Sequence, residues 1–331
     1  MIIKIEYQGK FWYNFVVFIR SFDRLVIWQG GSSMLIPKNL LIKFWDFDAK
    51  MDAERLSKQD FPTDLVEILD VPYVKNGGKL QMLDVYYPKG TKRNKKLPVI
   101  IDIHGGGWFY GTKDINKNYC LHLAQRGFVV FNLSYRLVPE VTVKEQLQDV
   151  MSALDFISKN LLSKYPCDKN RIYITGDSAG GQLAAFVPAL NSSDKMRKAF
   201  DTENPNIKIK AVGLTSPCPY LEPHGLMKFY LPHVLGKNWK KEKWAKYVDF
   251  NKVLRTSKDY PPTIIFTSLA DVIAEGQAKK AYKYMKKQGI KAKYDFALNP
   301  TLMHVYAVLD PDAKASVKAI DNMIKFFNKN K

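Results

Sequence analysis

The chain has 331 residues, of which 46% are hydrophobic and 25% are charged, and its formal net charge is +19. This hydrophobic content is sufficient for a sizeable buried core and argues against intrinsic disorder. The length fits one large domain, although two domains of ordinary size would also fit. We favour the single domain.

The basic residues lie in short clusters, such as residues 92–96 and 237–246, separated by ordinary core segments. Because no nucleic-acid-binding motif accompanies them, they predict a solvated surface and no specific nucleic-acid partner. Weak attraction to anionic substrates or surfaces stays open. The cysteines, Cys120, Cys167 and Cys218, are dispersed and odd in number, which argues against a disulfide framework and favours a cytoplasmic protein.

The first seventy residues predict a cap and a connector. The apolar run at residues 11–19 is too short to span a bilayer, and no signal-peptide cleavage site follows it. The apolar residues Phe11, Phe15, Phe18, Phe22 and Leu25 repeat at helical spacing, with a stop at Gly30-Gly31, so a cap helix is expected. Peripheral membrane docking is the alternative. Residues 46–70 are polar and predict a short helix and a connector.

From residue 71 onward, the pattern predicts a sheet. Asn76-Gly77-Gly78 separates two strand-like runs and predicts a hairpin turn. Strands and helices then alternate, which predicts a doubly wound, mainly parallel sheet with helices on both faces. The strands are expected at 99–103, 128–133, 172–175, 211–215, 263–268 and 292–296, and the helices at 115–125, 143–162, 180–190, 274–287 and 312–328. Residues 221–258 interrupt the alternation and predict a cap insertion, with aromatic residues that include Phe229, Tyr230, Trp239, Trp244 and Tyr247.

One pentapeptide, Gly176-Asp177-Ser178-Ala179-Gly180, places a serine where a strand turns directly into a helix. Such a turn strains the backbone at the serine and leaves no room for side chains two residues away, which explains both glycines. The pattern predicts that Ser178 is an acylating nucleophile.

A second motif, His104-Gly105-Gly106-Gly107-Trp108, directly follows an apolar strand. The backbone N–H groups of Gly105, Gly106 and Ala179 are predicted to form an oxyanion hole, which stabilises the charge that develops on an attacked carbonyl oxygen. His104 is expected to brace this loop. Trp108 is a candidate substrate contact.

These two motifs resemble the hormone-sensitive-lipase-like branch of the α/β-hydrolase esterases. Tyr135-Arg136-Leu137-Val138-Pro139-Glu140 and the segment 271–276 resemble that branch too, and the similarity runs from about residue 80 to 327. The resemblance implies an α/β-hydrolase fold with a helical cap and hydrolysis of small to medium acyl esters. It divides the chain into an N-terminal cap and connector, 1–70, and a catalytic domain, 71–331.

A serine nucleophile needs a base and an acid. His304 follows the last predicted strand, where the chain order of this fold requires the base, although the resembling enzymes usually have glycine where this chain has Val305. Asp271 follows the preceding strand and is the predicted acid. Glu275 is less suited because it lies inside the next helix. Asp177 is expected to tie the elbow, the tight turn at residues 176–180 that carries Ser178, to neighbouring backbone.

The sequence therefore predicts a serine carboxylesterase with a small-molecule ester substrate. The same residues would also serve an amide or formamide hydrolase, or a ligand-binding protein without turnover. No metal is expected, because no His, Asp and Glu cluster has ligand spacing. No cofactor is expected, because the glycines at 105–107 do not form a dinucleotide-binding turn.

Overall fold

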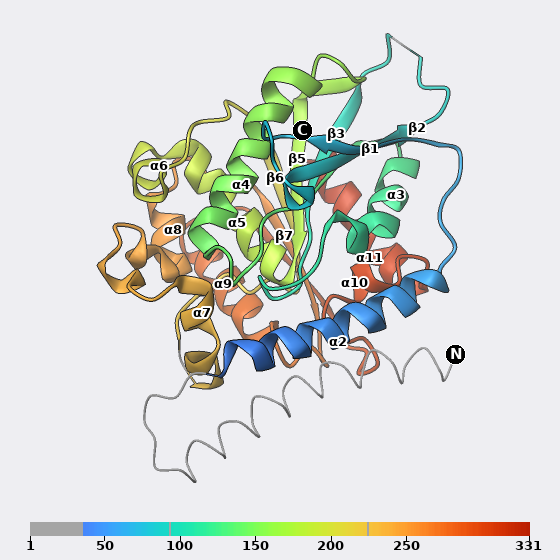
Figure 1. Cartoon of the computed structure of the whole chain (residues 1–331). Coiled ribbons are helices and arrows are strands. Elements are labelled where there is room, and N and C mark those ends of the chain that lie inside the picture. Colours follow the sequence, from blue (N-terminus) through green and yellow to red (C-terminus); the bar gives the residue numbers. More distant parts are fainter. Residues whose placement is uncertain (1–35, 93, 224) are drawn as a thin grey trace.

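The structure is a computed structural model that describes residues 36–331 except 93 and 224. Its centre is an eight-stranded sheet in the order β1-β2-β4-β3-β5-β6-β7-β8 (Figure 1). The strands are β1 Leu65–Pro72, β2 Met82–Pro88, β3 Leu97–Ile103, β4 Val129–Leu133, β5 Cys167–Asp177, β6 Ile209–Thr215, β7 Thr263–Ser268 and β8 Ala292–Ala297.

The sheet is antiparallel only where β2 pairs with β1 and β4, and the other pairs are parallel. This confirms the predicted mainly parallel sheet. The sheet begins at Leu65, within the segment that the sequence suggested to be a connector. Strand β1 lies at the edge of the sheet, and only Leu65 is buried on it, so the strand lacks the run of buried residues that marks the central strands.

Helices cover both faces of the sheet. The longer ones are α2 Lys38–Ser57, α3 Lys117–Gln125, α4 Val143–Phe156, α5 Ser178–Ser192, α9 Glu275–Lys287 and α11 Lys314–Asn328, and the shorter ones are α6 Asp194–Phe200, α7 Leu231–Leu235, α8 Phe250–Thr256 and α10 Tyr306–Leu309. One core contains Val99 and Ile101 with α4, α5 and α9, and the other contains Ile100 with α3 and α11. Since successive side chains of β3 enter opposite cores, the predicted double winding is confirmed.

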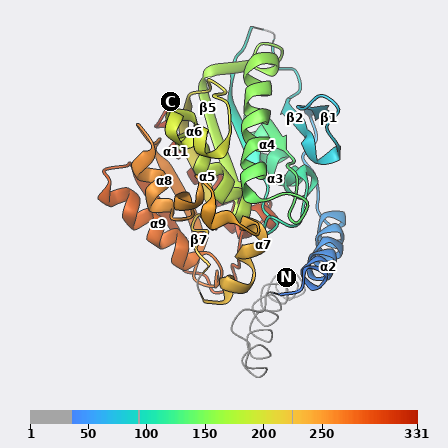
Figure 2. The same cartoon turned by 60° about the vertical axis from the view of Figure 1, so that its left-hand side comes forward.

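Helix α2 runs past one end of the sheet (Figures 1 and 2). Arg55 on α2 donates to the carbonyl oxygen of Leu309 in α10, and His233 in α7 lies 2.9 Å from the carbonyl oxygen of Ile36, just before α2. The sequence placed only a short helix after residue 46, whereas α2 begins at Lys38. Only Leu41, Trp45 and Asp48 are buried on it, so its apolar stripe is too narrow to reveal the helix. The predicted aromatic cap helix, 11–25, lies outside the described residues.

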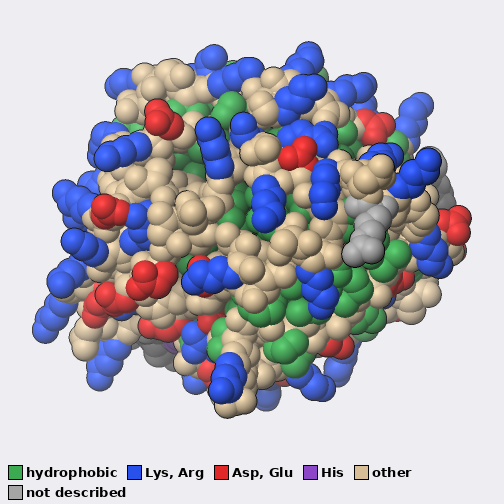
Figure 3. All heavy atoms as spheres, turned by 90° about the horizontal axis from the view of Figure 1, so that it is seen from above, with side chains coloured by type: hydrophobic (Ala, Val, Ile, Leu, Met, Phe, Trp, Pro, Cys, Tyr) green, Lys and Arg blue, Asp and Glu red, His purple; other side chains and the backbone are tan. Residues whose placement is uncertain are grey.

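The segment 221–258 connects β6 to β7 through α7, α8 and three short turns of 3₁₀ helix. Lys and Arg side chains are scattered over the face in Figure 3 rather than gathered in one stripe. No helix among the described residues is long and apolar enough to cross a membrane.

Candidate active site

A cavity of about 610 Å³ lies at the carboxyl end of the parallel strands. Ser178, which follows β5, and Val305, in the loop after β8, line it together with Gly106, which follows β3. Helix α2 contributes a wall through Trp45 and Asp48. The carboxyl end is where open α/β sheets bind ligands, because loops from several strands converge there.

Ser178 has a φ of 51°, in the left-handed region that non-glycine residues rarely adopt. The flanking glycines make this turn possible. A Cβ on Gly176 would lie 2.5 Å from the carbonyl oxygen of Gly180, and a Cβ on Gly180 would lie 2.1 Å from that of Ile103. The elbow therefore has the tight geometry that the pentapeptide predicts.

Ser178, His304 and Asp271 are brought together from three loops. The Oγ of Ser178 lies 2.9 Å from Nε2 of His304, and Nδ1 of His304 lies 2.8 Å from Oδ1 of Asp271. All three are buried. This arrangement allows the imidazole to take the serine proton while the carboxylate stabilises the resulting cation.

The Asp271 carboxylate is held in its ionised form. Burial alone would raise its pKa, but the charge and hydrogen bond of His304, with further donors, bring the pKa below its ordinary value. The N–H of Ala274 donates to Oδ1 at 2.9 Å, and the Thr267 hydroxyl donates to Oδ2 at 3.0 Å. Glu275 instead begins α9, where it faces Lys279.

Ser216 is a residue that sequence reasoning missed. It follows β6, is fully buried, and its Oγ accepts a hydrogen bond from the N–H of Val305 at 3.0 Å. Its side chain also bonds to Asp271 and helps to lower the pKa of that carboxyl. Ser216 thus joins the loop of the acid to the loop of the base. A small polar residue at the carboxyl end of a buried strand was the available signal.

The glycine loop differs from the sequence prediction at Gly105. Its N–H donates to Oδ1 of Asp177 at 3.1 Å, so this donor is already engaged and is not available to an oxyanion. The N–H groups of Gly106 and Gly107 donate to no backbone acceptor within the described residues. Gly107, which the sequence prediction omitted, therefore replaces Gly105 as a candidate donor beside Gly106 and Ala179.

Asp177 fastens the glycine loop to the elbow, as the sequence predicted. Its Oδ1 also accepts from the Asn116 amide at 2.8 Å, and the same amide donates to Asp102 at 2.9 Å. Burial, followed by the charge of Asp102, raises the pKa of Asp177 to about 7. Asp177 accepts from the backbone of Gly105 rather than pairing with His304, so it does not occupy the position of the acid that orients the histidine.

His104 braces the same loop. Its Nδ1 lies 2.8 Å from the carbonyl oxygen of Gly105, and its ring stacks on Tyr135 with centroids 4.4 Å apart. Burial lowers its pKa to about 4, so the ring is neutral. Trp108 is buried too, and its Nε1 donates to Gln182 at 3.0 Å. Since Trp108 is not among the described residues that line the cavity, its predicted contact with substrate is not supported.

The aromatic residues of 221–258 also lie away from the cavity lining. Trp244 and Tyr247 pack against Phe200, and Tyr230 packs against Phe109. They form core beneath the insertion and do not shape the cavity. The shape of the cavity comes instead from α2 and from residues 299–316.

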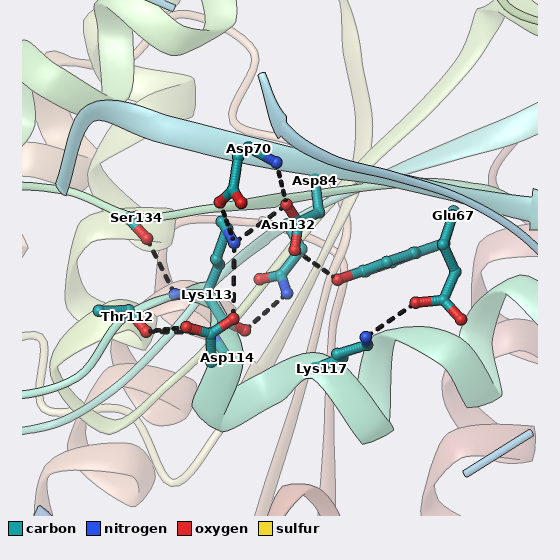
Figure 4. A network of polar contacts seen from close by, with 10 residues as sticks. Glu67, Asp70, Asp84, Thr112, Lys113, Asp114, Lys117, Asn132 and Ser134 are labelled. Carbon is teal, nitrogen blue, oxygen red and sulfur yellow. Dashed lines mark hydrogen bonds and ion pairs between the residues drawn. The ribbon is translucent and has the colours of Figure 1, made fainter. Parts of the chain in front are cut away.

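A buried ion pair anchors the segment that follows the glycine loop (Figure 4). Nζ of Lys113 lies 3.0 Å from Asp84 and 2.9 Å from Asp70. Burial would lower the pKa of Lys113, but the hydrogen bonds to these carboxylates raise it overall. The backbone of Lys113 is held as well, because its N–H donates to Ser134 and its carbonyl accepts from Asn132. The network ties this segment to β1, β2 and β4.

The described residues contain no group of three His, Cys, Asp or Glu side chains that could hold a metal ion. The serine hydroxyl, the imidazole and the backbone donors beside them are groups at the cavity that can act on a substrate.

Comparison with known proteins identifies the family to which the chain belongs. The model of the BD-FAE family matches residues 83–285, more than half of the chain. The chain belongs to the BD-FAE family. This match spans the glycine loop, the elbow and Asp271, and ends before His304.

The similar proteins include a probable carboxylic ester hydrolase, LipM, of Mycobacterium tuberculosis. It is 25% identical over 248 residues, which are 73% of this chain and 57% of the relative. The chain therefore spans little more than half of that protein.

Among solved structures, a phosphonate-inhibited esterase B from Lactobacillus rhamnosis is 26% identical, with a TM-score of 0.82 over 89% of this chain and 96% of that one. An esterase of the bacterial hormone-sensitive lipase family has a TM-score of 0.66 at 20% identity, covering 86% and 91%, and supports the fold alone. The chain has the α/β-hydrolase fold, and the resemblance drawn from its motifs is confirmed.

Proposed function

We propose that this chain is a serine carboxylic-ester hydrolase. The observation that carries the proposal is the continuous hydrogen-bonded arrangement of Ser178, His304 and Asp271 at the edge of the cavity. Ser178 attacks the ester carbonyl, His304 takes its proton and returns it to the leaving alcohol, and water then cleaves the acyl-enzyme by the same route. Gly106, Gly107 and Ala179 stabilise the oxyanion through their N–H groups.

The substrates that we propose are small to medium acyl esters. The similar esterase B was solved with a C4-C4 tributyrin phosphonate inhibitor, which has the dimensions of a short-chain ester. The cavity of about 610 Å³ has the size of sites that bind small organic ligands. Helix α2 would serve as the cap, since it supplies one wall of the cavity, whereas no described residue of the insertion at 221–258 lines it.

Turnover of p-nitrophenyl butyrate by wild type and by Ser178→Ala tests the proposal. Loss of the nucleophile is expected to lower kcat by about 10³-fold or more, because the imidazole then has no hydroxyl to activate. Ser163→Ala, which alters an exposed serine, is the matched control and keeps wild-type turnover. Equal rates for wild type and Ser178→Ala would reject the assignment.

Two further measurements separate the alternatives. A fluorophosphonate probe is expected to label wild type and not Ser178→Ala, because phosphonylation requires an activated serine. Absence of labelling in wild type would favour a ligand-binding protein. Comparing kcat/KM for matched butyrate esters and butyramides distinguishes an esterase from an amide hydrolase.

A further inference from the structure

Asp48 is an unusual side chain in the wall of the cavity. It lies on the inward face of α2, is 9% exposed, and lines the cavity together with Ser178. Within the part of the chain that the structure describes, no donor or cation is bonded to its carboxylate. A buried carboxylate that accepts no hydrogen bond from the described residues is costly, and a ligand in the cavity could supply the bond.

Two charged side chains near Asp48 on α2 already have other partners. Arg55 donates to Asp52 at 2.8 Å and to the carbonyl oxygen of Leu309 at 2.7 Å. Glu54 lies 2.5 Å from Lys58. Burial, and then the charge of Asp52, raise the pKa of Asp48 well above its ordinary value, and the charge of Arg55 offsets this rise only in part.

Two aromatic rings lie at the same wall. Trp45, one turn before Asp48 on α2, stacks on Tyr110 with centroids 6.0 Å apart, and both line the cavity. A Cβ on Gly107 would lie 2.2 Å from the Trp45 ring, so this wall packs directly on the glycine loop beside Ser178. A carboxylate beside aromatic rings has the chemistry of an ammonium site, because the rings and the anion both attract a cation.

We propose that Asp48, with Trp45 and Tyr110, binds an ammonium group carried by the ester substrate. This inference rests on the proposed function, since it names a substrate class for the same site. The ammonium group supplies a counter-charge to Asp48 within the cavity, while the carbonyl of the ester lies at Ser178. The excess of basic side chains elsewhere on the protein does not favour such a ligand, so selectivity comes from this wall.

The test compares two esters of the same shape, 2-(trimethylammonio)ethyl butyrate and its neutral isostere 3,3-dimethylbutyl butyrate. Both are titrated into Ser178→Ala protein, which does not consume them. We expect the charged ester to bind about tenfold more tightly, a difference of about 1.4 kcal/mol. Adding Asp48→Asn, which keeps the shape of the side chain, is expected to bring the ratio of the two dissociation constants close to one.

Glu54→Gln in the same Ser178→Ala background is the matched control. It removes the same charge from the same helix, at a carboxylate already paired with Lys58, and the ratio is expected to stay near that of the parent. Equal binding of the two esters, tighter binding of the neutral one, or a ratio unchanged by Asp48→Asn would overturn the inference. These outcomes do not depend on turnover, so they are distinct from a failure of wild type to cleave p-nitrophenyl butyrate.

Discussion

Replacement of Lys113 by methionine tests the buried network that supports the glycine loop. The Lys113 side chain is 7% exposed and its partner Asp84 is 1% exposed, so the variant leaves a carboxylate in the interior without its counter-ion. Removing one partner of a buried pair costs about 3–5 kcal/mol. Asp84 keeps hydrogen bonds from the N–H of Asp70 and the hydroxyl of Tyr86, so we expect the lower end, about 3 kcal/mol.

Equilibrium unfolding in urea measures this loss as a shift in the midpoint at constant slope. Lys117→Met is the matched control, because Lys117 pairs with Glu67 at 2.8 Å where both side chains are partly exposed. Its expected cost is at most about 1 kcal/mol. Adding Asp84→Asn to Lys113→Met is expected to recover part of the loss, because the uncompensated charge is gone. A cost below about 1 kcal/mol for Lys113→Met, or strict additivity with Asp84→Asn, would refute the reasoning.

Two further outcomes are expected. Gly180→Ala places a methyl group 2.1 Å from the carbonyl oxygen of Ile103 and is expected to lower the free energy of unfolding by about 3 kcal/mol. Gly276→Ala is the control, because open space surrounds that glycine, and it is expected to be neutral or stabilising. Thermal denaturation of both variants measures the difference. The pKa of Asp177 is raised to about 7 in the folded protein, from about 3.9 in the unfolded chain. The contribution of the protonated carboxyl to the free energy of unfolding is therefore fully present below pH 4 and is lost as the pH rises through 7. The free energy of unfolding of Asp177→Asn should therefore fall less than that of wild type between pH 4 and 8, and parallel curves would contradict this assignment.

The sequence correctly predicted features that depend on residues close together in the chain, such as a buried strand and the turn at Ser178. The strand from Thr263 to Ser268 was placed at its observed bounds, because a short run of buried apolar residues between turn signals has few other solutions. The elbow was predicted for the same reason, since the steric demand of its turn appears as glycines two residues on either side of Ser178. Helix α2 was placed too late because tertiary packing on the glycine loop, rather than a broad apolar face, holds it.

The identity of the free backbone donors could not be predicted in this way. Which N–H of the glycine loop is engaged depends on Asp177, which is 72 residues away from Gly105 in the chain. The bridge made by Ser216 likewise joins two loops that are distant in sequence. These two hydrogen bonds depend on how the strands pair in the sheet. A sequence motif does not specify the hydrogen bonds that it makes with distant residues.

Val305 shows how a departure from the family pattern is accommodated. Its φ of 51° is unusual for a β-branched residue, which explains why the resembling enzymes usually have glycine there, and it costs roughly 1–2 kcal/mol. The side chain is 4% exposed, and burying a valine contributes about 1.5–3 kcal/mol, which offsets that cost. The hydrogen bond from its N–H to Ser216 holds the backbone in place. His304 therefore stays within 2.9 Å of Ser178, and the valine forms a wall of the cavity that glycine would leave open.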